Sequence, residues 1–311
     1  MKTIYKAIVL SIFLTLGAIA ATPTGSILVY TADNSDGKIT PKTIEEQFKK
    51  AGFTISDNRD MNLPFTKQFQ KTTFDVYNLF TLYKSDAVIS LVKKYPNVGL
   101  FAPMSMSIYT KKGTKTISIS TLTPETMATI MGIPKDNKTL AELGKAVKAV
   151  FKSAMPNGTY ETMPYKSVAP KGKLVSHYSA EIDADEWDDE KEELQLTIEN
   201  ELKPNGFVMA GFNDLGMVFS ENKYQEYDFY DVYSICKLKV IYSIAINHPE
   251  AGAFAPCSLY MYKKKGEEKV YIGFPTVYNW RAAMAIDDKD GVAVLEDAQK
   301  RMDKILTESL E

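Results

Sequence analysis

The sequence predicts a mixed α/β protein built from two copies of one unit, and three observations carry this prediction. Residues 99–103 read Gly-Leu-Phe-Ala-Pro, and residues 252–256 read Gly-Ala-Phe-Ala-Pro, 153 positions later. Ten of the twenty positions from 94 to 113 are identical to those from 247 to 266. Segments with strand-like and helix-like periodicity alternate in the same order around both stretches, which indicates an internal duplication.

The first residues are typical of a secretory signal. Lys2 and Lys6 precede an apolar run at 7–20, and small residues stand at Ala18 and Ala20. A transmembrane anchor is the alternative, but the run is short for a bilayer span. We therefore expect residues 1–20 to be a cleaved signal peptide and the mature chain to be a periplasmic or secreted protein without a membrane span.

The charge balance argues against a polynucleotide partner. The chain has 37 basic and 39 acidic residues, and loss of Lys2 and Lys6 would leave 35 against 39. Binding to nucleic acid needs clustered positive charge that displaces counterions from phosphates. We therefore predict no nucleic-acid partner.

Each unit is predicted to begin with a strand and a helix. Residues 27–30 are a β-branched and aromatic run, and Thr40 followed by Pro41 is a helix start with Ile44 and Phe48 on its inward face. The helix is predicted to end at Gly52. The second copy repeats this plan with a helix that ends at Gly206.

An aromatic strand follows in each copy. Residues 74–80 and 230–236 are both rich in aromatic and β-branched residues, and the two sequences align best at an offset of 156. A helical segment follows in each copy and stops near Pro96 or Pro249. The repeated stretch then forms a hairpin in each unit, and amphipathic helices close it.

These elements divide the mature chain into a first domain at 21–154, a linker at 155–172 rich in proline and glycine, and a second domain at 173–311. Between Glu181 and Glu193, nine of thirteen residues are acidic. This run lacks the central glycine and terminal glutamate of a calcium-binding loop. We expect a solvated charged loop that leads into a helix start, where acidic residues are favourable.

The repeated stretch, with Gly-x-Phe-Ala-Pro followed by Met or Cys and then Ser, resembles family 302 of the domains of unknown function, in tandem. The resemblance covers most of the mature chain. It implies two tandem two-layer α/β sandwich domains, and it implies a dimer-like arrangement because single-domain members pair as dimers. It implies no activity, since none is established for the family. The family's Pro-Cys pair stands at Pro256-Cys257, whereas the first copy has Pro103-Met104, which argues against a cysteine chemistry required of both units.

A polar and aromatic sheet face is the first candidate site. Period-two alternation places serine and tyrosine on one face of the repeated strand. We expect aspartate and tyrosine of the aromatic strand to join this face. The candidate binding residues are Asp75, Tyr77, Ser105, Tyr109, Asp231, Tyr233, Ser258 and Tyr262. These faces either pack the two copies together as a pseudo-dimer or line a shared cleft, and an ordinary solvated face is the alternative.

The opposite face carries sulfur. A soft-metal or haem site could be assembled from Met104, Met106, Cys257, Met261 and His248. Packing in the core is favoured, because methionine commonly fills gaps under helices. Cys236 and Cys257, the only two cysteines, either form a disulfide or act as small buried apolar residues. Their counterparts in the first copy are Phe80 and Met104.

The sequence favours a non-enzymatic protein that binds a small apolar or anionic ligand or a protein partner. Ser258, His248 and Asp231 supply the residue types of a catalytic triad, but nothing in the sequence places them together. No phosphate-binding loop or other catalytic motif is recognisable, and no cofactor is identified. The alternative is an enzyme with a site between the copies, built from Asp231, Tyr233, Ser258 and Tyr262.

Overall fold

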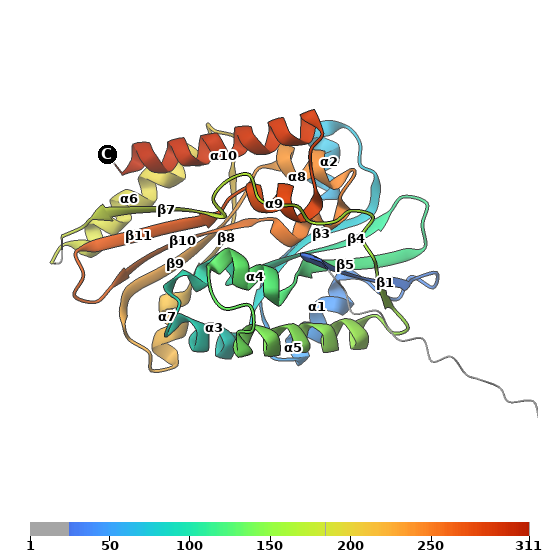
Figure 1. The fold of residues 1–311 in the computed structure, drawn as a ribbon, viewed down its shortest axis with the longest axis horizontal. Coiled ribbons are helices and arrows are strands. Elements are labelled where there is room, and N and C mark those ends of the chain that lie inside the picture. The colour runs from blue at the N-terminus through green and yellow to red at the C-terminus, as the bar shows by residue number, and fades with distance from the viewer. Residues whose placement is uncertain (1–24, 184, 311) are drawn as a thin grey trace, which may run out of the picture.

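The computed structural model describes residues 25–183 and 185–310. Figure 1 shows two sheets, one in each repeat, with helices packed on them. The mixed α/β class predicted from the sequence is confirmed. The predicted signal peptide, residues 1–20, lies outside the described residues.

The first repeat contains the six-stranded sheet A, in the order β2-β3-β4-β5-β1-β6. Its neighbouring strands are antiparallel. The elements are β1 (Ile27–Asp33), α1 (Pro41–Lys50), β2 (Thr54–Asp60), α2 (Asn62–Phe69), β3 (Phe74–Tyr83), α3 (Ser85–Val92), the 3₁₀ helix η1 (Pro96–Phe101), β4 (Met104–Lys111), β5 (Thr116–Leu122), α4 (Pro124–Met131), α5 (Lys138–Ala154) and β6 (Thr159–Tyr160).

The second repeat contains the five-stranded sheet B, in the order β7-β11-β10-β9-β8, again antiparallel. The elements are β7 (Val175–Glu181), α6 (Trp187–Leu202), β8 (Val208–Asp214), α7 (Leu215–Glu221), β9 (Tyr227–Cys236), α8 (Leu238–Ala245), the 3₁₀ helix η2 (Pro249–Phe254), β10 (Cys257–Lys264), β11 (Lys269–Pro275), α9 (Tyr278–Met284) and α10 (Lys289–Ser309). The order β2-β3-β4-β5-β1 of sheet A corresponds to β8-β9-β10-β11-β7 of sheet B, so the two repeats share one topology.

The predicted helix signals are present at the start of the first repeat. Thr40 caps α1 through a reciprocal pair of bonds with Thr43, and Pro41 is its first residue. Gly52 follows the helix at φ +79°, in the left-handed region that glycine occupies without steric cost. α1 buries Ile44 and Phe48, as predicted.

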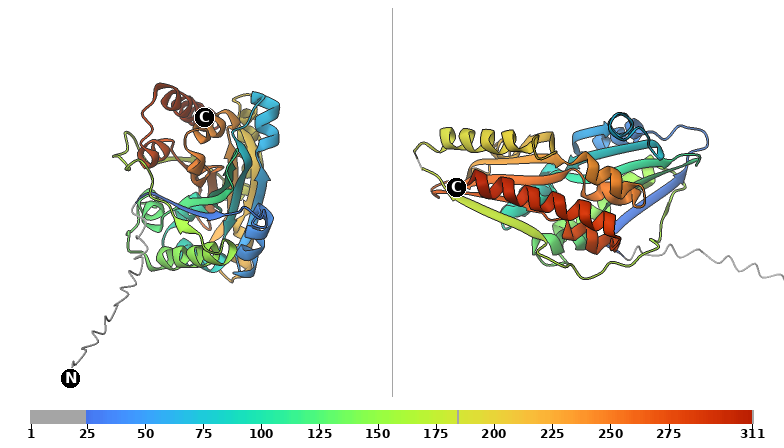
Figure 2. Two further views of the ribbon diagram at one scale, coloured as in Figure 1. Left: turned by 90° about the vertical axis from the view of Figure 1, so that its right-hand side faces the viewer. Right: turned by 90° about the horizontal axis from the view of Figure 1, so that it is seen from above.

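Helices cover one face of each sheet. In the first repeat, Phe48 packs against Phe80 of β3 and Phe151 of α5, with ring centroids 5.5 and 6.2 Å apart. In the second repeat, α10 lies along sheet B beside α6 and α8 (Figure 2). The opposite faces of the two sheets are turned toward the other repeat, because η2 packs on β4 and β5 while η1 packs on β10. The rest of this second face is covered by the repeat's own α2 or α7, since Phe65 packs on Tyr77 and Phe219 packs on Tyr230.

The predicted alignment of the two aromatic strands is wrong by three residues. In the register of the sheets, Tyr77 pairs with Tyr109 and Tyr230 pairs with Tyr262, so Tyr77 corresponds to Tyr230 at an offset of 153. An odd shift moves every side chain to the other face of a strand. The counterpart of Cys236 is therefore Tyr83, not Phe80.

The predicted linker and the acidic run both contain some regular secondary structure. Within the predicted linker, 155–172, β6 pairs with β1 at the edge of sheet A. In the acidic run, α6 begins at Trp187, so the later acidic residues lie in its first turns, as their charge favours. Among the helices of the described ranges, none combines the length and the hydropathy needed to cross a bilayer.

Candidate functional site

The two repeats meet along a surface that we call the seam, and its hydrogen bonds are reciprocal. The Ser105 hydroxyl donates to the carbonyl of Pro256 at 2.9 Å. The Ser258 hydroxyl donates to the carbonyl of Pro103 at 3.1 Å. Each serine and each proline is separated from its counterpart by 153 positions, so each repeat makes the same bond to the other.

Two buried tyrosines extend this symmetry. The Tyr77 hydroxyl donates to the carbonyl of Pro249 at 3.1 Å, and the Tyr230 hydroxyl donates to that of Pro96 at 2.6 Å. Tyr230 also accepts the amide of Gly99 at 2.9 Å. Burial raises the pKa of both phenols well above its usual value, so both hydroxyls stay protonated and able to donate.

The glycines of the repeated motif permit this close packing. A Cβ atom on Gly99 would lie 2.6 Å from the Cβ of Tyr260, and one on Gly252 would lie 2.4 Å from the Cβ of Ser107. Both distances are far below van der Waals contact. The motif therefore allows the 3₁₀ helix of one repeat to pack directly on the sheet of the other, so the role of its glycines is structural.

A cavity of about 480 Å³ lies at the seam, where the edge strands β2 and β8 of the two sheets come together. This volume falls in the range of small-molecule sites. We call it the seam cavity. It is lined from the first repeat by Asp57, Arg59, Met61, Pro64, Gln68, Leu79 and Thr81, and from the second by Lys203, Gly206, Phe207, Val208, Ala210, Ser234, Cys236, Lys237, Leu238, Lys239 and Pro256.

Two hydroxyls from equivalent positions line the seam cavity. Thr81 of β3 and Ser234 of β9 are 153 positions apart and are 1% and 3% exposed. The Thr81 hydroxyl has no hydrogen-bond partner among the described residues. Most buried polar groups are paired, so an unpaired one beside a cavity suits a ligand that supplies the missing bond.

The charged residues of the seam cavity are mostly basic. The lining contains four basic residues, Arg59, Lys203, Lys237 and Lys239, and one acidic residue, Asp57. Arg59 lies 3.0 Å from Asp57 and donates to the Ala210 carbonyl at 3.0 Å, which ties β2 to β8. In the described part of the chain, Lys203 and Lys239 make no ion pair. The remaining walls are largely apolar, so the seam cavity is chemically suited to an anion with a hydrocarbon part.

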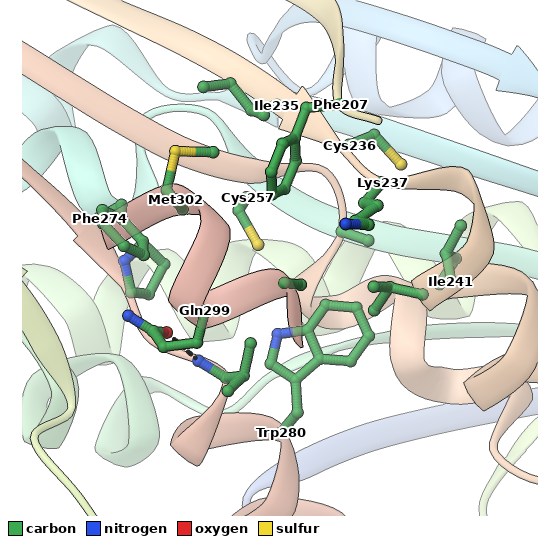
Figure 3. Close-up of a pocket in the computed structure, with 15 residues that line it drawn as sticks. Phe207, Ile235, Cys236, Lys237, Ile241, Cys257, Phe274, Trp280, Gln299 and Met302 are labelled. Carbon is green, nitrogen blue, oxygen red and sulfur yellow. Dashed lines mark hydrogen bonds between the residues drawn. The ribbon is translucent and has the colours of Figure 1, made fainter. Parts of the chain in front are cut away.

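A smaller cavity of about 60 Å³ adjoins the first, and we call it the inner cavity (Figure 3). It lies on the helix-covered side of sheet B and shares Phe207, Cys236 and Lys237 with the seam cavity. Cys236 and Cys257 both line it and are free thiols in this structure. Burial raises the pKa of each thiol to about 12, so both are neutral near pH 7.

None of the candidate binding residues lines the seam cavity. Tyr77, Ser105 and Ser258 bond across the seam, while Tyr109 and Tyr262 lie buried on the same sheet faces. Asp75 is exposed near the hairpin turn, where its carboxylate accepts the Gly113 amide at 3.3 Å. The five buried residues named above pack the repeats together rather than surround an open space.

Asp231 and Tyr233 do not share the face of Ser258 and Tyr262, and that expectation is wrong. Asp231 pairs with Met261, and Tyr233 pairs with Leu259, so both project toward the helix layer. The cause is the three-residue error in the strand alignment. The alternative enzyme site built from these four residues is therefore not assembled.

Asp231 is instead part of a buried charge cluster under α6. Its carboxylate is 2.8 Å from the Lys191 ammonium and accepts the Gln195 amide at 2.8 Å. Burial raises its pKa above the usual value, although the bond from Lys191 lowers it in part. The triad of Ser258, His248 and Asp231 is also not formed, because His248 contacts Glu250 at 3.2 Å on the seam side.

The sulfur-containing residues of the alternative metal or haem site lie in two separate hydrophobic cores. Met104 and Met106 are buried under the helices of the first repeat, whereas Met261 and Cys257 lie under those of the second. His248 precedes η2 and is not among them. Within residues 25–183 and 185–310, no group of three or more His, Cys, Asp or Glu side chains could hold a metal ion.

The sequence contained a signal for only part of the seam cavity. Thr81 and Ser234 are hydroxyl residues within apolar strands at the same 153-residue offset as the repeated motif. An alignment at that offset would have exposed them. Lys203 is equivalent to Lys49, since the carbonyl of each accepts the amide of the glycine that ends its helix. Lys239 and Arg59 have no basic counterpart in the other repeat, and only the fold brings the three residues together.

Comparison with known proteins gives a family and no activity. The model of the family described as "Domain of unknown function DUF302" matches residues 31–154 and again 188–309. A crystal structure of an uncharacterized conserved DUF302 protein from Bacillus stearothermophilus is similar over 45% of this chain and 100% of that chain, with 17% identity and a TM-score of 0.36. No curated protein matches the chain.

Proposed function

Because the chain belongs to the DUF302 family, in two copies, and the family has no known activity, we propose from the site itself that this protein binds a small amphipathic anion in the seam cavity. The observation that carries the proposal is the composition of that cavity. Four basic side chains, one carboxylate and an unpaired buried hydroxyl surround about 480 Å³ between apolar walls.

The ligand head in this proposal lies near Thr81, Lys203 and Lys239. The two lysines have no ion pair in the described part of the chain, so they can contact an anion without breaking an existing bond. A charge-assisted hydrogen bond is stronger than a neutral one. The hydrocarbon part of the ligand lies along Leu79, Leu238 and the other apolar walls.

The arrangement of the repeats supports a single site rather than two. We propose that the repeats act as the two halves of a pseudo-dimer, with Thr81 and Ser234 contributed from equivalent positions to one shared cavity. The same two-fold arrangement in a dimer of single domains would place two identical residues there. Duplication within one chain allowed the walls to diverge, so that Lys239 stands where the first repeat has Asp86.

We also propose that the protein acts in the periplasm or outside the cell, after removal of residues 1–20. The basic residues and the following apolar run support this proposal. The intact mass of the protein purified from its own host tests it. A mass that includes residues 1–20 would contradict cleavage.

Octanoate and 1-octanol test the binding proposal, because they share a hydrocarbon chain and differ in charge. Calorimetric titration should show octanoate binding and much weaker binding of the alcohol. Lys203→Gln with Lys239→Gln should weaken octanoate binding by about tenfold to a hundredfold, the usual effect of losing charged hydrogen bonds. Lys145→Gln with Lys152→Gln, on the exposed side of α5, is the control with the same change in net charge.

Equal affinity for acid and alcohol, or equal loss in both double variants, would contradict the proposal. Native mass spectrometry of protein from its own host is the complementary measurement. We expect an adduct with the mass of an organic acid. The adduct should be absent from the Lys203 and Lys239 double variant and present in the control.

A further inference from the structure

The inner cavity is almost wholly apolar, and the amide of Gln299 and the ammonium of Lys237 are already bonded. Gln299 accepts the Val277 amide at 3.1 Å and donates to Asp303 at 2.9 Å. The Lys237 ammonium donates to Asp297 at 2.9 Å and to the Asn205 carbonyl at 3.2 Å. With both thiols neutral, no group remains that would hold a water molecule by several hydrogen bonds. Such a cavity favours hydrocarbon.

A shared wall separates this space from the seam cavity. Phe207, Cys236 and Lys237 line both cavities, and the Lys237 ammonium lies 4.9 Å from the centre of the Phe207 ring. Figure 3 shows the side chains of Phe207 and Cys257 close together, with Trp280 below them. An anion held at the seam therefore has an apolar space directly behind one wall of its site.

The inner cavity belongs to the second repeat alone. Cys257 corresponds to Met104 at the 153-residue offset, and the cavities beside Met104 measure only about 20 and 10 Å³. The longer methionine side chain fills in the first repeat what the smaller cysteine leaves open in the second. The departure from the repeat at this position thus has a structural consequence.

We propose that the ligand of the seam cavity is a straight-chain aliphatic carboxylate whose tail passes Phe207 and ends in the inner cavity, beside Cys257 and Trp280. This inference rests on the proposed function, since it requires the head group to bind at the seam. An engineered apolar cavity of about 150 Å³ holds benzene, so 60 Å³ has room for about two or three carbons. The inner cavity therefore takes the chain end and no more.

Chain length tests the proposal. From butanoate to dodecanoate, affinity should rise by about fourfold for each buried methylene and then level off when the inner cavity is full. Cys257→Met, which reproduces the first repeat, should lower the affinity for the long acids by about tenfold or more. It should leave the affinity for butanoate unchanged. Cys257→Ala, which keeps the cavity open, is the matched control.

Tryptophan fluorescence gives a second readout. The chain has two tryptophans, so Trp187→Phe leaves Trp280 as the only one. A carboxylate that carries bromine at its chain end should quench Trp280, and the same acid brominated next to its head should quench it much less. Cys257→Met should abolish this difference.

The outcomes separate this inference from the proposed function. If butanoate and octanoate bind at the seam but affinity is independent of chain length, the inference is wrong and the seam site stands. Equal loss of long-chain affinity in Cys257→Met and Cys257→Ala, or quenching that is independent of bromine position, would also overturn it. If no carboxylate binds, both proposals are wrong.

Discussion

Tyr77 and Tyr230 reach across the seam from opposite repeats and make the same hydrogen bond. Each phenol donates to the carbonyl of the proline that begins the other repeat's 3₁₀ helix, Pro249 or Pro96. Both tyrosines are fully buried, so neither hydroxyl can exchange its partner for water. This pair of bonds fixes the position of one repeat on the other.

Tyr77→Phe and Tyr230→Phe should each destabilise the protein, because each removes a buried hydrogen bond across the seam, although the Ser107 hydroxyl still donates to the Pro249 carbonyl in the first variant. We expect a loss of about 1 to 2 kcal/mol for Tyr77→Phe in urea unfolding. Tyr230→Phe should cost more, since its hydroxyl also accepts the Gly99 amide. Tyr262→Phe is the control, because its hydroxyl has no bond among the described residues. A loss in the control as large as in Tyr77→Phe would show that the seam bonds are not responsible.

Gly99→Ala and Gly252→Ala should each force the repeats apart. The new methyl group would lie within 2.6 Å of the Tyr260 Cβ or 2.4 Å of the Ser107 Cβ, and neither of these atoms can rotate away. We expect a loss of about 1 to 3 kcal/mol in the free energy of unfolding. Gly211→Ala, whose methyl would meet Ser234 at an ordinary 3.7 Å, should be close to neutral. Neutral substitutions at both motif glycines would contradict the close packing.

The duplication could be predicted because its strongest signal, Gly-x-Phe-Ala-Pro, has the same structural role at the seam in both repeats. The alignment of the aromatic strands failed for an identifiable reason. The letters Asp-Val-Tyr occur at 75–77 and again at 231–233, three residues out of structural register. Local identity therefore favoured the wrong offset, and the odd shift reversed the face assigned to Asp231 and Tyr233.

The seam cavity could not be predicted, because it is made by packing between elements far apart in the chain. Arg59 and Lys239 are single charged residues with no pattern in their own segments. Thr81 becomes unusual only when the fold buries its hydroxyl and leaves it unpaired. Sequence periodicity predicts which residues share one face of a strand or helix, whereas a cavity depends on how two such faces pack against each other.

The charge cluster under α6 predicts a pH dependence of stability. The Asp231 carboxyl is buried, and burial raises its pKa above the usual 3.8. Between the unfolded and folded pKa values the native state binds more protons than the unfolded state, so the contribution of Asp231 to stability falls as pH rises. The stability of the wild type relative to Asp231→Asn should therefore decrease from about pH 3.8 through the raised value.

Asp297 provides the opposite case for the same experiment. Burial alone would raise its pKa, but hydrogen bonds from Lys237 and Arg301 outweigh this effect and lower it. The stability of the wild type relative to Asp297→Asn should therefore be lost as pH falls through the lowered pKa. Urea unfolding over about pH 2 to 7 measures both differences, and the change for Asp297 is expected below about pH 3.8. Slopes of the same sign in the two variants would contradict the assignment.

The two thiols should resist alkylation in the folded protein. A pKa near 12, raised by burial from 9, reduces the thiolate fraction of Cys236 by about a thousandfold. Iodoacetamide near pH 8 should therefore label Cys236 and Cys257 only after denaturant is added, as intact mass would show. Labelling of neither thiol in denaturant, with a mass two hydrogens lower, would reveal a disulfide instead of the free thiols of this structure.

Thr81→Val separates the role of the seam cavity in binding from its role in folding. Valine keeps the shape of threonine and removes the unpaired hydroxyl, so the unliganded protein should keep its stability or gain about 1 kcal/mol. Octanoate affinity should fall by about tenfold, because the ligand loses a hydrogen bond. Thr121→Val is the matched control, since Thr121 is also buried and unpaired but does not line the seam cavity. It should reproduce the effect on stability and leave octanoate affinity unchanged, and an equal loss of affinity in both variants would show that Thr81 does not contact the ligand.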